Sequence, residues 1–175
     1  MTLGQWKGVL IVLMVVFISP CHAHDGTVNI SGTIQDNTCE LAPDSQNKKV
    51  NMGSVADAQF SRAGDFSVAK SFTLNLQNCG PAASEATVTF SGTADTQNPE
   101  LFAIESGADS ATGLALGLFD SNGKRIAPGG TSEGVVLTPG QSFVALAFSA
   151  RYVAVRDSVT AGNANVAVTF VVGYD

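Results

Sequence analysis

The chain closes with Asn165-Val166-Ala167-Val168-Thr169-Phe170-Val171-Val172-Gly173-Tyr174. Apolar or aromatic side chains occupy every second position of this segment: Val166, Val168, Phe170, Val172 and Tyr174. Because successive side chains of a β-strand point to opposite faces, the alternation predicts a strand with one apolar face. No segment after residue 24 has the period of an amphipathic helix, so we expect an all-β fold.

The same alternation recurs along the chain between clusters of Gly, Asn, Asp and Pro. We predict further strands at residues 67–76, 86–91, 114–119, 124–127, 134–137 and 142–155. Asn122-Gly123, between two of these segments, is a strong signal for a tight turn. About eight short strands separated by turn residues predict an antiparallel sandwich or barrel, and no linker or repeat divides it into two domains.

An alternating segment also precedes the first predicted strand of this set. Small or apolar residues occupy one face: Gly26, Val28, Ile30, Gly32 and Ile34. The positions between them are all polar, so this is a ribbon with one apolar edge. By itself, this pattern favours an ordinary first strand of a complete sandwich.

The composition excludes several classes of function. The chain has 175 residues and a net charge of −6, and charged residues make up only 14% of it. Hydrophobic residues make up 45%, which is enough to bury a core in one domain of ordinary size. The acidic balance, with no cluster of Lys and Arg, argues against nucleic acid or an anionic membrane surface as a partner.

Residues 1–23 have the pattern of a secretory signal peptide that is removed by cleavage after Ala23. Lys7 is the only charge before the apolar run at residues 9–18, and that run is too short to span a bilayer. Residues 18–21 loosely imitate the lipobox of a lipoprotein, but Pro20 makes that alternative the weaker one.

Cleavage at this point changes the number of cysteines. Cys21 leaves with the signal peptide, whereas Cys39 and Cys79 remain. An even pair in an exported chain predicts a disulfide, because that compartment is oxidising. Metal binding by the two thiolates is the alternative, but no other soft ligand lies near them in the sequence.

Two short motifs resemble catalytic signatures without their companions. Gly130-Thr131-Ser132-Glu133-Gly134 spells the nucleophile elbow of hydrolases, but no histidine follows it in the chain to act as a base. Ser67-Val68-Ala69-Lys70 spells the serine motif of penicillin-binding enzymes, but the other two motifs of that class are absent. We therefore expect that the protein is not an enzyme.

Metal ligands are also sparse. His24, the only histidine after the signal peptide, has no cluster around it. Asp120-Ser121-Asn122-Gly123 resembles the start of a calcium loop, but Lys124 stands where an oxygen ligand is needed, so a turn is the better interpretation. No metal and no cofactor are expected.

Several further segments of the sequence are informative because of their order and spacing. They are Asp36-Asn37-Thr38-Cys39, Leu76-Gln77-Asn78-Cys79, Phe90-Ser91-Gly92-Thr93-Ala94-Asp95, Phe148-Ser149-Ala150-Arg151-Tyr152, Gly162 and the penultimate Tyr174. With the two alternating ends, they make the whole mature chain resemble subunits of type 1-like pili, which the chaperone–usher pathway of Gram-negative bacteria assembles.

The resemblance implies an incomplete immunoglobulin-like sandwich that lacks its final strand, with an N-terminal donor-strand extension. Residues 24–36 would form the donor arm and residues 37–175 the pilin domain. The missing strand would leave an acceptor groove bordered by Val166, Val168, Phe170, Val172 and Tyr174. A periplasmic chaperone would fill this groove until, at the outer-membrane usher, the arm of the next subunit replaces it through Gly26, Val28, Ile30, Gly32 and Ile34. The protein would pass through the periplasm and end in an extracellular fimbrium.

A secreted β-sandwich that binds sugars in the manner of a lectin is the alternative. It would need aromatic side chains in loops, but Trp6 leaves with the signal peptide, and Tyr152 and Tyr174 fall within predicted strands. A single domain with an N-terminal arm also argues against a tip adhesin. The position in the fibre, rod or minor adaptor, stays open.

Overall fold

The computed structural model describes residues 31–33 and 36–175. The chain divides into two units, Met1–Thr33 and Ile34–Asp175. In the first unit, the described residues 31–33 form neither helix nor strand. In the second unit the elements are β1 (Glu40–Leu41), α1 (Pro43–Gln46), a 3-10 helix (Asp57–Gln59), β2 (Lys70–Gln77), β3 (Glu85–Ser91), β4 (Phe102–Ala103), β5 (Leu114–Asp120), β6 (Arg125–Ile126), β7 (Val135–Val136), β8 (Phe143–Ala154) and β9 (Thr169–Tyr174). The predicted all-β fold is thus confirmed.

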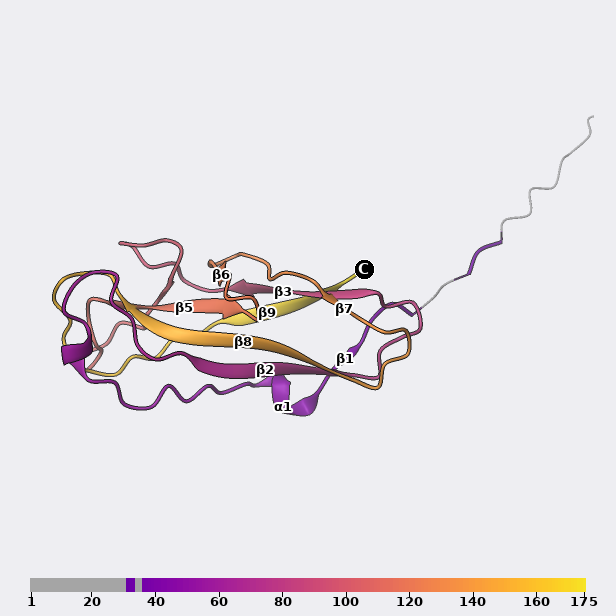
Figure 1. The fold of residues 1–175 in the computed structure, drawn as a ribbon, viewed down its shortest axis with the longest axis horizontal. Coiled ribbons are helices and arrows are strands. Elements are labelled where there is room, and N and C mark those ends of the chain that lie inside the picture. Colours follow the sequence, from indigo (N-terminus) through magenta and orange to yellow (C-terminus); the bar gives the residue numbers. More distant parts are fainter. Residues whose placement is uncertain (1–30, 34–35) are drawn as a thin grey trace, which may run out of the picture. The chain divides into compact units, whose positions relative to one another are not determined.

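These strands form two sheets within the unit Ile34–Asp175 (Figure 1). The larger sheet has the order β1-β2-β8-β5-β4, with β6 also paired to β5, and the smaller sheet has the order β7-β3-β9. Every pair of named strands is antiparallel. The arrangement is an immunoglobulin-like sandwich, in which the main core is buried between the two sheets.

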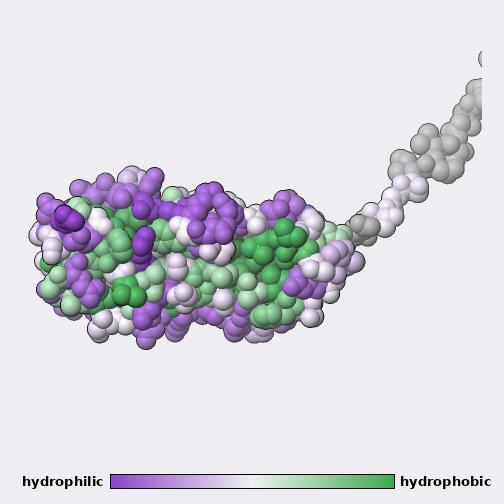
Figure 2. All heavy atoms as spheres, viewed as in Figure 1, coloured by the Kyte–Doolittle hydropathy of each residue, from purple (hydrophilic) through white to green (hydrophobic). Residues whose placement is uncertain are grey.

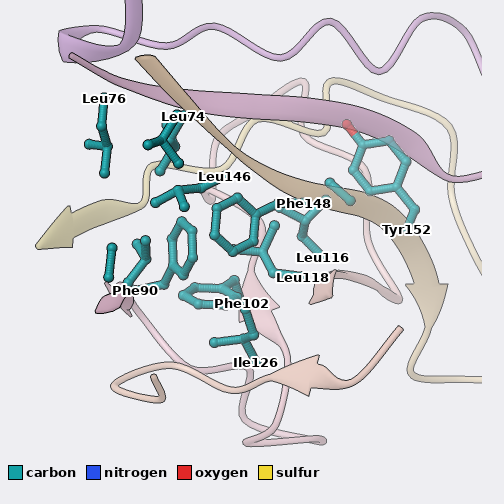
Figure 3. Close-up of a cluster of buried hydrophobic side chains, with 14 of the residues drawn as sticks. Leu74, Leu76, Phe90, Phe102, Leu116, Leu118, Ile126, Leu146, Phe148 and Tyr152 are labelled. Atoms are coloured by element: carbon teal, nitrogen blue, oxygen red, sulfur yellow. The ribbon is translucent and has the colours of Figure 1, made fainter. Parts of the chain in front are cut away.

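The core lies between the two sheets (Figure 3). On β2, Leu74 and Leu76 are almost completely buried, and they stand opposite inward-facing residues of β8. Leu74 pairs with Leu146, which is also buried, and Val88 of β3 closes the core from the smaller sheet. Alternate positions of these strands therefore point inward, as the period of two predicts.

The ends of two strands differ from the prediction. The segment 67–69 lies outside β2, because the Oγ atom of Ser67 accepts a hydrogen bond from the Tyr152 amide at 3.0 Å and so occupies the place of a backbone carbonyl. The segment 165–168 lies outside β9, because the partner strand β3 ends at Ser91, opposite Thr169. Alternation thus extends further along the chain than backbone pairing does.

Four short elements were not predicted from the sequence: β1, β4, α1 and the 3-10 helix. Each has two to four residues, which is too short to display a period. The predicted disulfide is present and joins Cys39 to Cys79. Among the described residues, no helix has the length and apolar character needed to cross a bilayer.

Candidate assembly edge

The last strand, β9, lies at an edge of the smaller sheet. It pairs with β3 alone, in a register that places Phe170 opposite Phe90 and Tyr174 opposite Ala86. Within the described part of the chain, no strand pairs with its other side. An edge strand presents unpaired N–H and C=O groups in a row, which is a template for pairing with another strand.

The inner face of the segment 166–174 is only half buried, although it belongs to the core. Five side chains of alternating position pack against the buried cluster while remaining partly exposed: Val166, Val168, Phe170, Val172 and Tyr174. On the neighbouring strand β3, Val88 is 0% exposed and Phe90 is 3% exposed. The hydrophobic core is therefore open to solvent along this segment, which we call the open edge.

Partly exposed apolar residues also occur on the side of the larger sheet. They pack against the same core and include Leu41, Met52, Val55 and Phe72. A chain of aromatic contacts connects Phe72 to the open edge: its ring centroid lies 5.7 Å from that of Phe148, which lies 5.0 Å from Phe90, which lies 6.3 Å from Phe170. The core is thus continuous from β2 to the open edge at the level of Phe170.

Two tyrosine hydroxyls fix the ends of this region. Tyr174 Oη donates to the Cys39 carbonyl oxygen at 3.1 Å, and Tyr152 Oη donates to the Ala164 carbonyl oxygen at 2.6 Å. Burial raises the pKa of Tyr174, although its hydrogen bond to Cys39 opposes that shift, and burial also raises the pKa of Tyr152. Both hydroxyls stay protonated at neutral pH and can donate these bonds.

The surface of the domain also exposes other large apolar side chains. Val136 is 82% exposed, Val171 68% and Phe143 54%. Figure 2 shows apolar surface gathered toward the end of the domain at which Figure 1 places β1 and β7. Exposed apolar surface of this kind is typical of a protein that contacts partners.

Comparisons with known proteins connect this geometry to a family. The model of the family described as "Fimbrial protein" matches residues 28–175, which is most of the chain. The chain belongs to the fimbrial protein family. It is a structural subunit of a fimbria, a fibre on the outside of the cell.

Individual relatives agree with this membership. The uncharacterized fimbrial-like protein YcbV of Escherichia coli (strain K12) is 44% identical over 153 residues, covering 87% of this chain and 88% of YcbV. The probable major fimbrial subunit LpfA of Escherichia coli O157:H7 is 36% identical over 152 residues, covering 86% of this chain and 84% of LpfA.

Solved structures agree on the fold. The Burkholderia pseudomallei antigen and type I fimbria protein BPSL1626 superposes with a TM-score of 0.60 at 33% identity, covering 79% of this chain and 90% of that one. The P pilus rod subunit PapA superposes with a TM-score of 0.63 at 21% identity, covering 78% of this chain and 99% of PapA. The similarity to PapA concerns the fold alone.

Most of the arm predicted for this fimbrial protein lies outside the described residues, namely Gly26, Val28, Ile30 and Ile34. Gly32 is described, and it is exposed and in neither helix nor strand. From Asp36 onward the chain is fixed to the domain, because the Asp36 carbonyl oxygen accepts a hydrogen bond from the Ala82 amide at 3.1 Å.

The motifs that resemble catalytic or metal sites have structural roles in this fimbrial protein. Ser132 bonds to both sides of Val88: its amide donates to the Val88 carbonyl, and its Oγ accepts from the Val88 amide. Asp120 Oδ1 accepts hydrogen bonds from the Asn122 and Lys124 amides at 3.0 and 2.9 Å and so holds the predicted turn. No cluster of potential metal ligands occurs among the residues that the structure describes.

Proposed function

We propose that this fimbrial subunit polymerises by donor-strand exchange, in which the arm of one copy adds a strand along the open edge of the next. The observation that carries the proposal is the open edge itself. An edge strand with a free side and a half-buried apolar row needs a strand with apolar residues at alternate positions to complete the core.

The arm has the pattern that this site requires. Gly26, Val28, Ile30, Gly32 and Ile34 share one face, as do the five side chains of the open edge. Every pair of named strands in the domain is antiparallel, and an antiparallel strand added beside β9 would complete an immunoglobulin-like sandwich. We therefore propose that residues 24–36 form the donor arm and that residues 37–175 form the acceptor domain.

The free subunit must be protected before it assembles, because an open edge beside an exposed core is prone to aggregation. We propose that a periplasmic chaperone covers the open edge after removal of residues 1–23, and that an outer-membrane usher mediates the exchange for the next arm. Secretion then takes the subunit from the periplasm into the surface fimbria. The disulfide between Cys39 and Cys79 supports passage through an oxidising compartment.

The alternative function as a sugar-binding module finds less support. Tyr152 lies in β8 and Tyr174 in β9, and both hydroxyls bond to backbone carbonyls of the domain. Neither tyrosine offers a ring in a loop for stacking on a sugar.

A substitution in the arm tests the proposal. Ile30→Asp removes about 1.5–3 kcal/mol of apolar burial and places a carboxylate in an apolar site, at a further cost of several kcal/mol. We expect the mature variant to form a one-to-one complex with the periplasmic chaperone, measured by co-purification, but to form no multimers on size-exclusion chromatography.

Ser31→Asp is the matched control, because it adds the same charge on the polar face of the arm. This variant should polymerise like the original protein. If Ile30→Asp polymerises as fast as Ser31→Asp does, the apolar face of the arm does not enter a partner, and donor-strand exchange through this arm is wrong.

A further inference from the structure

Three lysines line one recess of the domain, next to the start of β2. The recess has a volume of about 400 Å³ and is lined by residues 48–51 and 70–73, including Lys48, Lys49 and Lys70. No aspartate or glutamate lines it. Like charges held together raise the local positive potential, so an anionic group placed here is stabilised.

None of the three lysines takes part in an ion pair within the described residues. The ion pairs found there join Arg62 to Asp65, Lys124 to Glu133 and Arg125 to Glu100. The recess therefore holds positive charge that no nearby carboxylate neutralises, although the whole chain has a net charge of −6.

Along the length of the domain, the recess lies at the level of the Val166 half of the open edge. On β2, Phe72 and Leu74 face inward opposite Phe148 and Leu146, and Lys70 occupies the preceding position of the same face, opposite the buried Ala150. Phe72 lies at the level of Phe170 through the aromatic contacts described above. Since β2 begins at Lys70 and its other end pairs with β1 next to Cys39, the recess lies away from the Tyr174 end of the open edge.

The opposite end of the domain is acidic. Hydrogen bonds join Asp36 to Ala82, Thr38 to Gly80, Ser84 to Asp175, and Cys79 to Gln141, so these segments lie together. This end consists of segments 36–41, 78–86, 136–143 and 174–175, which contain no lysine or arginine. They contain four acidic residues: Asp36, Glu40, Glu85 and Asp175. It is also the end from which the proposed arm leaves the domain.

The direction of the added strand brings the acidic end of the incoming copy toward the lysine recess of the copy that receives its arm. A strand antiparallel to β9 begins at the Tyr174 end and leaves at the Val166 end, which is the half of the domain that holds the lysine recess. Asp36 follows Ile34 by two residues and has the same strand parity as the apolar face of the arm. It is exposed, and its Oδ1 accepts hydrogen bonds from the Thr38 amide and hydroxyl at 3.1 and 3.0 Å. Its carboxylate is thus the first charge after the apolar positions end.

We propose that the lysine recess of one copy binds the carboxylate of Asp36 at the base of the next copy's arm. The contact fixes the register of the arm along the open edge, because sliding by two residues would move the carboxylate away from the lysines. It also attracts the acidic end of the incoming copy and makes assembly depend on salt. This inference rests on the donor-strand exchange proposed above and names the contact made at the C-terminal end of the inserted arm.

Charge reversal on each side tests the contact. Assembly of the mature chain is followed by light scattering after dilution from denaturant, in about 20 mM and about 500 mM NaCl. We expect Lys70→Asp and Asp36→Lys to slow assembly at low salt by about tenfold each, and the double variant to recover to within about threefold of the original rate. High salt should reduce all these differences.

Arg156→Asp is the matched control for Lys70→Asp, because it changes the net charge equally at an exposed cation that lies outside the recess and takes part in no ion pair among the described residues. It should assemble at the original rate, and equal slowing would show a net-charge effect and overturn the proposal. Failure of the double variant to recover would overturn it too. If Ile30→Asp abolishes assembly while the charge variants have no effect, only the recess is wrong; if Ile30→Asp assembles normally, the donor-strand proposal itself fails.

Discussion

Moving the arm to the other end of the chain should let one molecule complete its own core. The variant begins at Asp36 and carries a copy of residues 24–36 after Asp175, joined by a flexible linker. Only a short linker is needed, because Asp175 directly follows Tyr174, where an antiparallel strand beside β9 would begin. We expect a monomer with a higher melting temperature than the same chain without the added segment.

The free energy gained by packing the added segment is best obtained from a substitution within that segment, since the entropy of ordering the segment then cancels. If Ile30 of the copy packs against the half-buried row that includes Phe170 and Val172, Ile30→Ala there removes about 2–5 kcal/mol. For a domain of roughly 150 residues, 1 kcal/mol shifts the melting temperature by about 3 °C. The expected decrease is therefore about 6–15 °C.

Thermal unfolding followed by circular dichroism measures this difference, and sedimentation verifies that each variant is monomeric. Ser31→Ala in the added segment is the control, because this residue lies on the polar face and its effect should stay within about 0.5 kcal/mol. Equal melting temperatures for the Ile30 and Ser31 variants would refute the reasoning. So would an added segment that does not raise the melting temperature at all.

Three further predictions concern the domain itself. Replacing Cys39 and Cys79 by Ala opens a loop of 40 residues and should reduce the free energy of unfolding by about 4 kcal/mol, measured by urea titration. Tyr174→Phe removes the hydrogen bond to the Cys39 carbonyl and should cost about 0.5–1.5 kcal/mol at pH 7. Because burial raises the pKa of Tyr174, the folded state holds the hydroxyl proton more tightly than the unfolded state does. The stability that the protonated hydroxyl confers is complete below pH about 10 and is lost at higher pH. The Phe variant should therefore lose less stability than the original protein in alkaline denaturation. Gly80→Ala would drive a Cβ atom into the Asp36 carbonyl, so it should lower the melting temperature, whereas Gly32→Ala meets no neighbouring atom and should leave it unchanged.

The sequence alone predicted where the main strands of the core lie. The alternation located β2, β3 and β8 to within a few residues at each end, because the period of a strand is a local property of the backbone. The disulfide was also predictable, because oxidation of a cysteine pair depends on the compartment to which a chain is exported. So was the Asn122-Gly123 turn, because a glycine with φ of +79° is a matter of local backbone geometry.

Only the tertiary structure decided which strands pair and where each pairing ends. A period of two marks a face, but it does not distinguish a central strand from an edge strand, so the alternation at residues 165–174 could not show that β9 has a partner on one side alone. The lysine recess was equally hidden. Lys48 and Lys70 are distant in the sequence and meet because the chain after α1 runs back beside the start of β2, a contact that depends on packing rather than on any pattern of neighbouring residues.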